Sequence, residues 1–282
     1  PGWVANNNMA LLIAPGTGCN SSTCQRTAES HDGESANAPL LVIDYTDNTL
    51  PSVTSVGGAC GSDNVLIVEY DSAVGAEALD TSLYTLNVGT VTAAAAQSDT
   101  VIVLSVTGLV AGTSTTLSID GVDQTIDYSG LLGRYFDQRS GAGGAKVNYT
   151  TGLFSGDEFL RLDSQVNFNW GSGTPTIFPS VSGNNERFSI RWTGSVVPTV
   201  TGSYEFRLYS DDGMRLDLDG TQIVDFWTLH GPSYSSISAA QALTSGQAYT
   251  VQAEHYENTG QAVAQIEWRR DGGAWELSLI HI

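Results

Sequence analysis

Apolar and polar residues alternate with a period of two along most of this chain, and the alternating runs are short. In the middle of the chain, turn-rich stretches separate runs at 64–70, 84–88, 101–106 and 115–119. Successive side chains of a strand point to opposite faces, so such runs predict strands with one buried face. Tyr204, Phe206 and Leu208 mark the apolar face of a further strand. Long helical periodicity is absent, and the alanine run 93–96 is too short to nucleate a helix. The pattern predicts an all-β chain.

The strands fall into three segments, which we interpret as tandem β-sandwiches. Residues 1–48 contain two apolar strands around a polar loop, which is too little to be stable alone. They resemble the last strands of a jelly-roll module, so we interpret them as the end of a truncated sandwich. Residues 52–126 have the strand spacing of a small sandwich of their own. Residues 129–277 form the C-terminal half, and the ending 278–282 is interpreted as a non-native tail.

The charge balance restricts the partners of the chain. Eleven Lys and Arg face 30 Asp and Glu in 282 residues, which gives a formal net charge of −19. Nucleic acids and anionic membranes need basic patches, so we expect neither as a partner. No run approaches the ~20 apolar residues that span a bilayer. The chain starts without an initiator methionine and is interpreted as a fragment of an extracellular or cell-surface protein.

Three cysteines give information about the redox compartment of the protein. Cys19 and Cys24 bracket four residues, a short loop that a disulfide would close in an oxidising compartment. The spacing does not match a zinc site, because no paired ligands follow. Cys60 is left over, with a partner in a missing N-terminal part or as a buried thiol.

Two adjacent acids, Asp211 and Asp212, end the strand that contains Leu208. Ca²⁺ takes six to eight oxygen ligands in irregular geometry, so a carboxylate pair at a loop is a candidate metal site. Neighbouring side chains of a strand diverge, so both acids reach one ion only if the backbone leaves strand geometry, which Gly213 permits. The plain alternative is a solvated turn, in which Asp and Gly are common.

Catalytic motifs are absent from the sequence. There is no Gly-x-Ser-x-Gly elbow, no His-Glu-x-x-His helix and no phosphate-binding loop. A glycosidase needs two carboxylates set across a cleft, and none of the 30 acids is singled out for that task. We therefore expect no enzymatic activity in this fragment, while a catalytic domain elsewhere in the full protein stays open.

Several sequence blocks surround the acid pair in a fixed order. They lie at 130–136, 166–170, 188–194, 201–206, 216–220, 223–227, 246–249, 254–262 and 266–268. Their order and spacing over residues 129–277 resemble the protective-antigen (PA-14) domain, a lectin-like β-sandwich of bacterial toxins, glycosidases and yeast adhesins. The runs 65–74 and 84–86 resemble a bacterial immunoglobulin-like spacer.

The PA-14 resemblance implies a set of metal ligands. In the carbohydrate-binding members a cis peptide joins the two acids, which hold a Ca²⁺ that chelates vicinal sugar hydroxyls. By resemblance, Asp211 and Asp212 carry the ion and Asn258 supplies an amide oxygen. Backbone carbonyls between Gly260 and Ala262 would complete the shell. The adhesins have an aromatic residue in place of Ala262 and an inserted subdomain that is not found in this sequence.

The resemblance also implies sugar contacts. The loop with Trp227 and His230 is similar to the one beside the metal in bacterial members, and Gln261 is a further candidate contact. The alternatives are that Trp227 is a core residue and that His230 caps a loop. Glu257 is a ligand or a solvated side chain, and we expect it to be solvated. The tryptophans expected to pack rather than bind are Trp170, Trp192 and Trp268.

Together these observations predict non-catalytic, Ca²⁺-dependent carbohydrate binding in adhesion or substrate targeting. The alternatives are a structural or protein-interaction module of a surface protein, and an accessory domain of a glycosidase.

Overall fold

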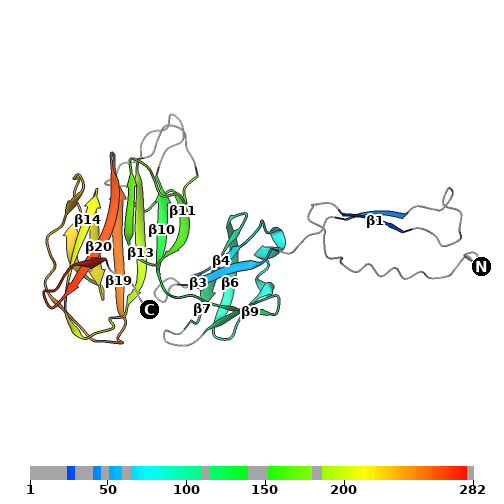
Figure 1. Ribbon diagram of the computed structural model, residues 1–282, viewed down its shortest axis with the longest axis horizontal. Helices are drawn as coiled ribbons and strands as arrows, with labels where there is room; N and C mark the ends of the chain where they lie inside the picture. Colours follow the sequence, from blue (N-terminus) through cyan, green and yellow to red (C-terminus); the bar gives the residue numbers. More distant parts are fainter. Residues whose placement is uncertain are drawn as a thin grey trace, which may run out of the picture. The chain divides into compact units, whose positions relative to one another are not determined.

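The computed structural model describes residues 24–28, 41–45, 51–58, 65–109, 115–138, 152–179 and 186–277. The chain divides into two compact units, Pro1–Leu50 and Pro51–Ile282. The first unit contains an antiparallel pair, β1 (Cys24–Ala28) and β2 (Leu41–Tyr45) (Figure 1). The predicted Cys19–Cys24 disulfide, Cys60 and the tail 278–282 lie outside the described residues, apart from the position of Cys24 at the start of β1.

The described residues contain strands and two single-turn 3-10 segments, η1 (Ala76–Leu79) and η2 (Thr81–Leu83), which confirms the all-β prediction. None of the helical segments in these ranges is long and apolar enough to cross a bilayer.

Two antiparallel sheets enclose a small core in residues 51–128. One sheet has the order β3 (Val53–Gly58), β4 (Val65–Tyr70), β7 (Val101–Thr107) and β6 (Thr90–Ser98). The other has the order β5 (Tyr84–Leu86), β8 (Thr116–Ile119) and β9 (Val122–Thr125). Leu66, Ile102, Leu104 and Leu117 are fully buried between them. The four predicted runs are strands β4, β5, β7 and β8, while the likeness to an immunoglobulin-like spacer stays a prediction.

Strand β6 is an edge strand that the sequence reasoning did not predict. It contains the alanine run 93–96, and its register along β7 shifts at two points. Alanine has a poor intrinsic preference for strands, so the pattern carried no strand signal there. Pairing with β7 decides the conformation of this segment.

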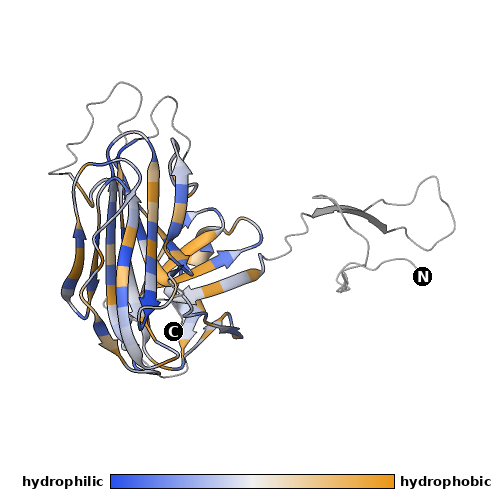
Figure 2. Cartoon of the chain, turned by 60° about the vertical axis from the view of Figure 1, so that its left-hand side comes forward, coloured by the Kyte–Doolittle hydropathy of each residue, from blue (hydrophilic) through white to orange (hydrophobic). Residues whose placement is uncertain are grey.

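The C-terminal half is a sandwich of two antiparallel sheets. The larger sheet has the order β11 (Asp157–Asp163), β10 (Leu131–Asp137), β13 (Phe188–Val196), β19 (Tyr249–Glu257), β15 (Met214–Leu218) and β16 (Thr221–Phe226). The second sheet has the order β12 (Asn167–Gly171), β20 (Ala262–Arg270), β14 (Gly202–Asp211) and β17 (Ser233–Tyr234), with β18 (Gln241–Leu243) paired to β14 and β21 (Glu276–Leu277) to β20. Hydrophobic and hydrophilic residues alternate visibly along these strands (Figure 2).

The core between the two sheets follows the predicted alternation. Tyr204, Phe206 and Leu208 all face inward and are buried. Trp192 is fully buried, and Trp170 and Trp268 pack against the same cluster, as expected for packing residues. The core thus fixes the ends of β14 and β19, where the candidate site residues lie.

A buried carboxylate, Asp163, lies at the end of β11 and is 5% exposed. It accepts hydrogen bonds from the Tyr135 hydroxyl, from Trp192 Nε1 at 2.7 Å and from Arg161 Nε at 2.6 Å. Burial raises the pKa of Asp163, and the Arg161 charge and the three donors oppose that rise. A Cβ on Gly133 would lie 2.7 Å from Asp163 Oδ2, so the network leaves room for glycine alone at that position.

The middle sheets and the C-terminal sandwich share apolar and polar contacts. Val65 and Ile67 of β4 pack with Leu132 of β10 in one buried cluster. The side-chain amide of Gln97 donates to the carbonyl of Leu160 at 2.9 Å and accepts from its backbone N–H. The Gln97 amide therefore bonds to β11 as a neighbouring strand would.

Candidate functional site

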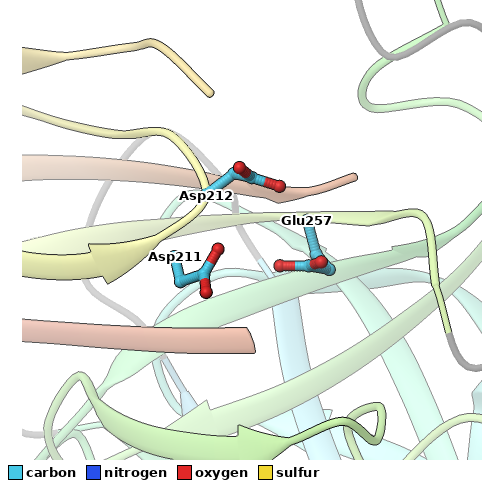
Figure 3. A group of neighbouring side chains, drawn as sticks. All are labelled: Asp211, Asp212 and Glu257. Atoms are coloured by element: carbon cyan, nitrogen blue, oxygen red, sulfur yellow. The ribbon is translucent and has the colours of Figure 1, made fainter. Parts of the chain in front are cut away.

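Asp211 ends β14 and Asp212 follows it across a cis peptide bond. Their side chains are 4% and 5% exposed. One carboxylate oxygen from each, together with one from Glu257 at the end of β19, lies within 4.8 Å of the other two. Figure 3 shows the three carboxylates gathered around a common point. The ends of two strands that are distant in sequence thus bring three acids together.

Glu257 is 2% exposed, so the expectation that it is solvated is wrong. The register explains its position, because Val251, Ala253 and His255 of the same strand are all buried, and Glu257 continues this alternation. Neither Glu257 oxygen accepts a hydrogen bond of normal geometry within the described ranges. An acid at the end of a strand does not by itself reveal this burial, which depends on the register of β19.

Gly213 is required for a different reason from the one expected. It does not adopt a positive φ. A Cβ at this position would lie 2.1 Å from the Tyr256 ring, so only glycine lets Tyr256 pack there. The change of direction takes place at the bond between Asp211 and Asp212.

Backbone donors orient Asp212. The N–H of His230 donates to Oδ1 at 3.1 Å, and the N–H of Asn258 donates to Oδ2 at 2.9 Å. The side-chain oxygen Oδ1 of Asn258 is buried and has no hydrogen-bond partner in the described part of the chain. A buried acceptor without a partner, on the residue that follows Glu257, is a group that a cation would stabilise.

The electrostatics of the three carboxylates also indicate a cation site. Burial, followed by the charges of Asp212 and Asp211, raises the pKa of Glu257 to about 9. Burial and Asp212 also raise the pKa of Asp211 to about 6. Both shifts arise because negative charges are crowded away from water. A positive ion at the centre would favour the ionised form of each carboxyl.

The donor set fits calcium best among the common metals. It consists of oxygens, which hard cations prefer and which exclude soft metals such as Cu⁺. Two ligand oxygens on opposite sides of a Ca²⁺ lie about 4.6–5.2 Å apart, which the separations within 4.8 Å allow. Mg²⁺ needs shorter bonds and near-ideal octahedral geometry, which a crowded set of three carboxylates does not favour.

The predicted sugar contacts lie in different settings. The His230 ring stacks on Phe226 with ring centroids 3.8 Å apart, and its backbone holds Asp212, so it adjoins the cluster. Its Nε2 is buried without a partner within the described residues. Gln261 is exposed in the turn after Asn258.

Trp227 is half-buried, so it belongs neither to the core nor to the open surface. Its ring meets Tyr256 edge-on at 4.7 Å between centroids and lies over the Arg215 guanidinium at 4.5 Å. Arg215 and Arg191 both pair with the buried carboxylate of Glu254, at Nε–O distances of 2.5 and 2.6 Å. Trp227 is therefore held on the outer face of the larger sheet, one ring away from the acid cluster.

Comparisons with known proteins agree with this architecture. The profile of the PA14 domain matches residues 127–278. Anti-sigma-I factor RsgI3 of Acetivibrio thermocellus is 34% identical over 140 residues, which cover 50% of this chain and 19% of that protein. Among solved structures, an anti-sigma factor domain-containing protein is 28% identical with a TM-score of 0.44, covering 54% of this chain and 47% of that one. A PA14 sugar-binding domain from an RTX adhesin is 21% identical with a TM-score of 0.41, covering 53% and 94%.

The present chain thus spans about a fifth of the length of the curated relative and about half of the first solved structure. The profile match extends over more than half of the chain and includes every strand of the C-terminal sandwich. The PA-14 resemblance inferred from the sequence blocks is confirmed. This chain belongs to the PA14 domain family.

Proposed function

We propose that the C-terminal sandwich binds carbohydrate through a Ca²⁺ held by Asp211, Asp212 and Glu257, with Asn258 Oδ1 as a fourth ligand. The observation that carries the proposal is the cluster of three buried carboxylates. When bound, the ion supplies a positive centre that accepts sugar hydroxyl oxygens in place of water.

The residues of the chain have separate tasks in this proposal. The backbone N–H groups of His230 and Asn258 fix both oxygens of Asp212, so that this carboxylate is oriented before the ion arrives. Three carboxylates leave the loaded site with a net charge of −1, which favours neutral sugars over anionic ones. His230 and Gln261 are the side chains proposed to contact the sugar.

The setting that suits this chemistry is outside the cell. Extracellular calcium modules work with dissociation constants of about 10⁻⁴–10⁻³ M, and a net charge of −19 keeps such a protein soluble. The proposed role is adhesion to a glycan or targeting to a polysaccharide.

The curated relative favours a second role for the same binding event. It is an anti-sigma-I factor, so binding of the same carbohydrate in a protein of that kind would serve regulation. In that case the carbohydrate-bound state would be passed to a regulatory part outside this chain. Both roles require the same ligand site.

Isothermal titration of the whole chain with Ca²⁺ tests the metal site. We expect one saturable ion, and we expect Asp211→Asn/Asp212→Asn to weaken binding on the order of 100-fold or more, equivalent to about 2.8 kcal/mol. The matched control is Asp120→Asn/Asp123→Asn in the turn and strand of the β8–β9 hairpin, which removes the same charge and should bind as the wild type does. Equal heats from the wild type and the Asp211/Asp212 variant would defeat the assignment.

A glycan array, probed with Ca²⁺ and with EDTA, tests the carbohydrate. We expect binding to neutral glycans that EDTA removes and that added Ca²⁺ restores. Binding that is unaffected by EDTA, or none at all, would favour a structural or protein-docking module.

A further inference from the structure

A pocket lined in part by polar side chains lies on the outer face of the larger sheet, away from the acid cluster. It has a volume of about 240 Å³, and its lining includes Thr193, Asp217, Thr250 and Gln252. This volume lies below the ~300 Å³ at which pockets for drug-sized ligands begin, so it suits a single small ring.

The strand register gathers these polar groups. Thr193 of β13 and Asp217 of β15 both pair with Gln252 of β19, so the three side chains form one row across the sheet. Leu216 and Leu218 on either side of Asp217 are buried in the core, which places Asp217 on the opposite face. The pairing with β16 shifts register between Leu216 and Asp217, a β-bulge of the kind that re-aims side chains beside binding sites.

A tight hairpin turn contributes to the end of the pocket. Asp219 and Gly220 both have positive φ, at 48° and 72°, as a two-residue hairpin turn requires. Asp219 Oδ1 accepts from the backbone N–H of Thr250 at 2.7 Å and from its hydroxyl at 3.1 Å, which anchors the turn to β19. The pocket is therefore built by ordered backbone on several sides.

Two polar groups of the pocket, the Asp217 carboxylate and the Gln252 side-chain amide, have no hydrogen-bond partner in the described residues. Neither oxygen of Asp217 accepts a hydrogen bond from the described residues, and Oδ1 is buried. The side-chain amide of Gln252 likewise has no partner in these ranges. An ionised carboxylate only accepts and an amide both donates and accepts, so a matching ligand carries hydroxyls close together.

The neighbouring charges favour a neutral ligand. Arg215 of β15 and Glu254 of β19 lie on the same face of the sheet as Asp217 and Gln252. The Arg215 guanidinium donates to the Glu254 carboxylate. Burial raises the pKa of Asp217, the Arg215 charge lowers it and Glu254 raises it. A cationic ligand would meet Arg215, and an anionic ligand would meet Asp217 and Glu254.

We propose that this pocket is a second, metal-independent subsite for one residue of a neutral sugar. Asp217 accepts from two of its hydroxyls, and the Gln252 amide bonds a third. Asp217 follows Asp212 by five residues along an extended chain, which corresponds to about 16 Å.

Nuclear magnetic resonance of the whole ¹⁵N-labelled chain in EDTA tests this proposal without the metal site. The probes are methyl glycosides of glucose, mannose and galactose, with methyl glucuronide and methylammonium as charged comparisons. We expect at least one neutral glycoside to shift the Gln252 side-chain amide and the Gly220 backbone amide saturably. The same shifts should persist in Asp211→Asn/Asp212→Asn, so a failed calcium proposal leaves this result unchanged.

Pocket variants complete the test. Asp217→Asn and Gln252→Ala should each weaken glycoside binding about tenfold, and Gln241→Ala, which removes a half-buried amide from β18 of the other sheet, should not. The proposal is overturned if no neutral glycoside shifts these amides, or if a charged probe shifts them as strongly. It is also overturned if Gln241→Ala weakens binding as much as Gln252→Ala does. Calcium binding at the acid cluster would stand in each case.

Discussion

Replacing Asp163 with alanine is expected to lower the free energy of unfolding of the C-terminal sandwich by about 3–5 kcal/mol. The carboxylate accepts from Tyr135, Trp192 and Arg161, and the first two of these residues are fully buried. Without Asp163, a buried hydroxyl and a buried indole N–H lose their acceptor, and Arg161 loses its counter-ion.

Chemical denaturation followed by tryptophan fluorescence measures this loss. Asp157→Ala is the matched control, because Asp157 begins the same strand, is exposed and should change stability by no more than about 0.5 kcal/mol. Asp163→Asn keeps the shape and two acceptor lone pairs, so it should fall between the wild type and the alanine variant. A loss of less than about 1 kcal/mol in Asp163→Ala would show that the network does not stabilise the fold as described.

Glu257→Gln is expected to change stability in opposite directions with and without calcium. Burial and two neighbouring carboxylates raise the pKa of Glu257 to about 9. Between the unfolded-state and the folded-state pKa of this carboxyl, the unfolded chain releases the proton and the folded chain keeps it, so the free energy of unfolding falls as the pH rises. At neutral pH Glu257 therefore destabilises the metal-free protein. The glutamine variant should therefore be more stable in EDTA, on the order of 1–3 kcal/mol.

With calcium the wild type should be the more stable of the two proteins. A bound ion stabilises the fold by about 2.7 kcal/mol when its free concentration is 100 times its dissociation constant. The Glu257→Gln variant has lost one anionic ligand, so calcium should stabilise it much less. Melting temperatures in EDTA and at rising Ca²⁺ concentration measure both effects, and Glu276→Gln, an exposed acid in β21, serves as the control. If calcium raises the melting temperature of Glu257→Gln as much as that of the wild type, Glu257 is not a ligand.

The sequence predicts the layers of this fold better than its edges. Alternation locates strands such as β7 and β14, because one of their faces is more buried than the other. It misses β6, where alanines at an edge strand leave no contrast between the faces. There the pairing partner decides the conformation, and no local pattern reports it.

The candidate site was accessible from the sequence only in part. The pair Asp211 and Asp212 stands out through its adjacency and through the surrounding family blocks. Glu257 does not stand out, because an acid at the end of a strand is equally compatible with a solvated side chain until the register of β19 is known. Gly213 shows the same limit, since its requirement comes from the approach of Tyr256, a residue 43 positions away in the sequence.

The bond between Gln97 and Leu160 bears on the solubility of the protein. Strand β11 is the outermost strand of its sheet, and an outermost strand presents free N–H and C=O groups to which another chain can add by intermolecular pairing. One glutamine side chain occupies both groups of Leu160 in the middle of that strand. The middle sheets thereby cover part of this edge against intermolecular pairing.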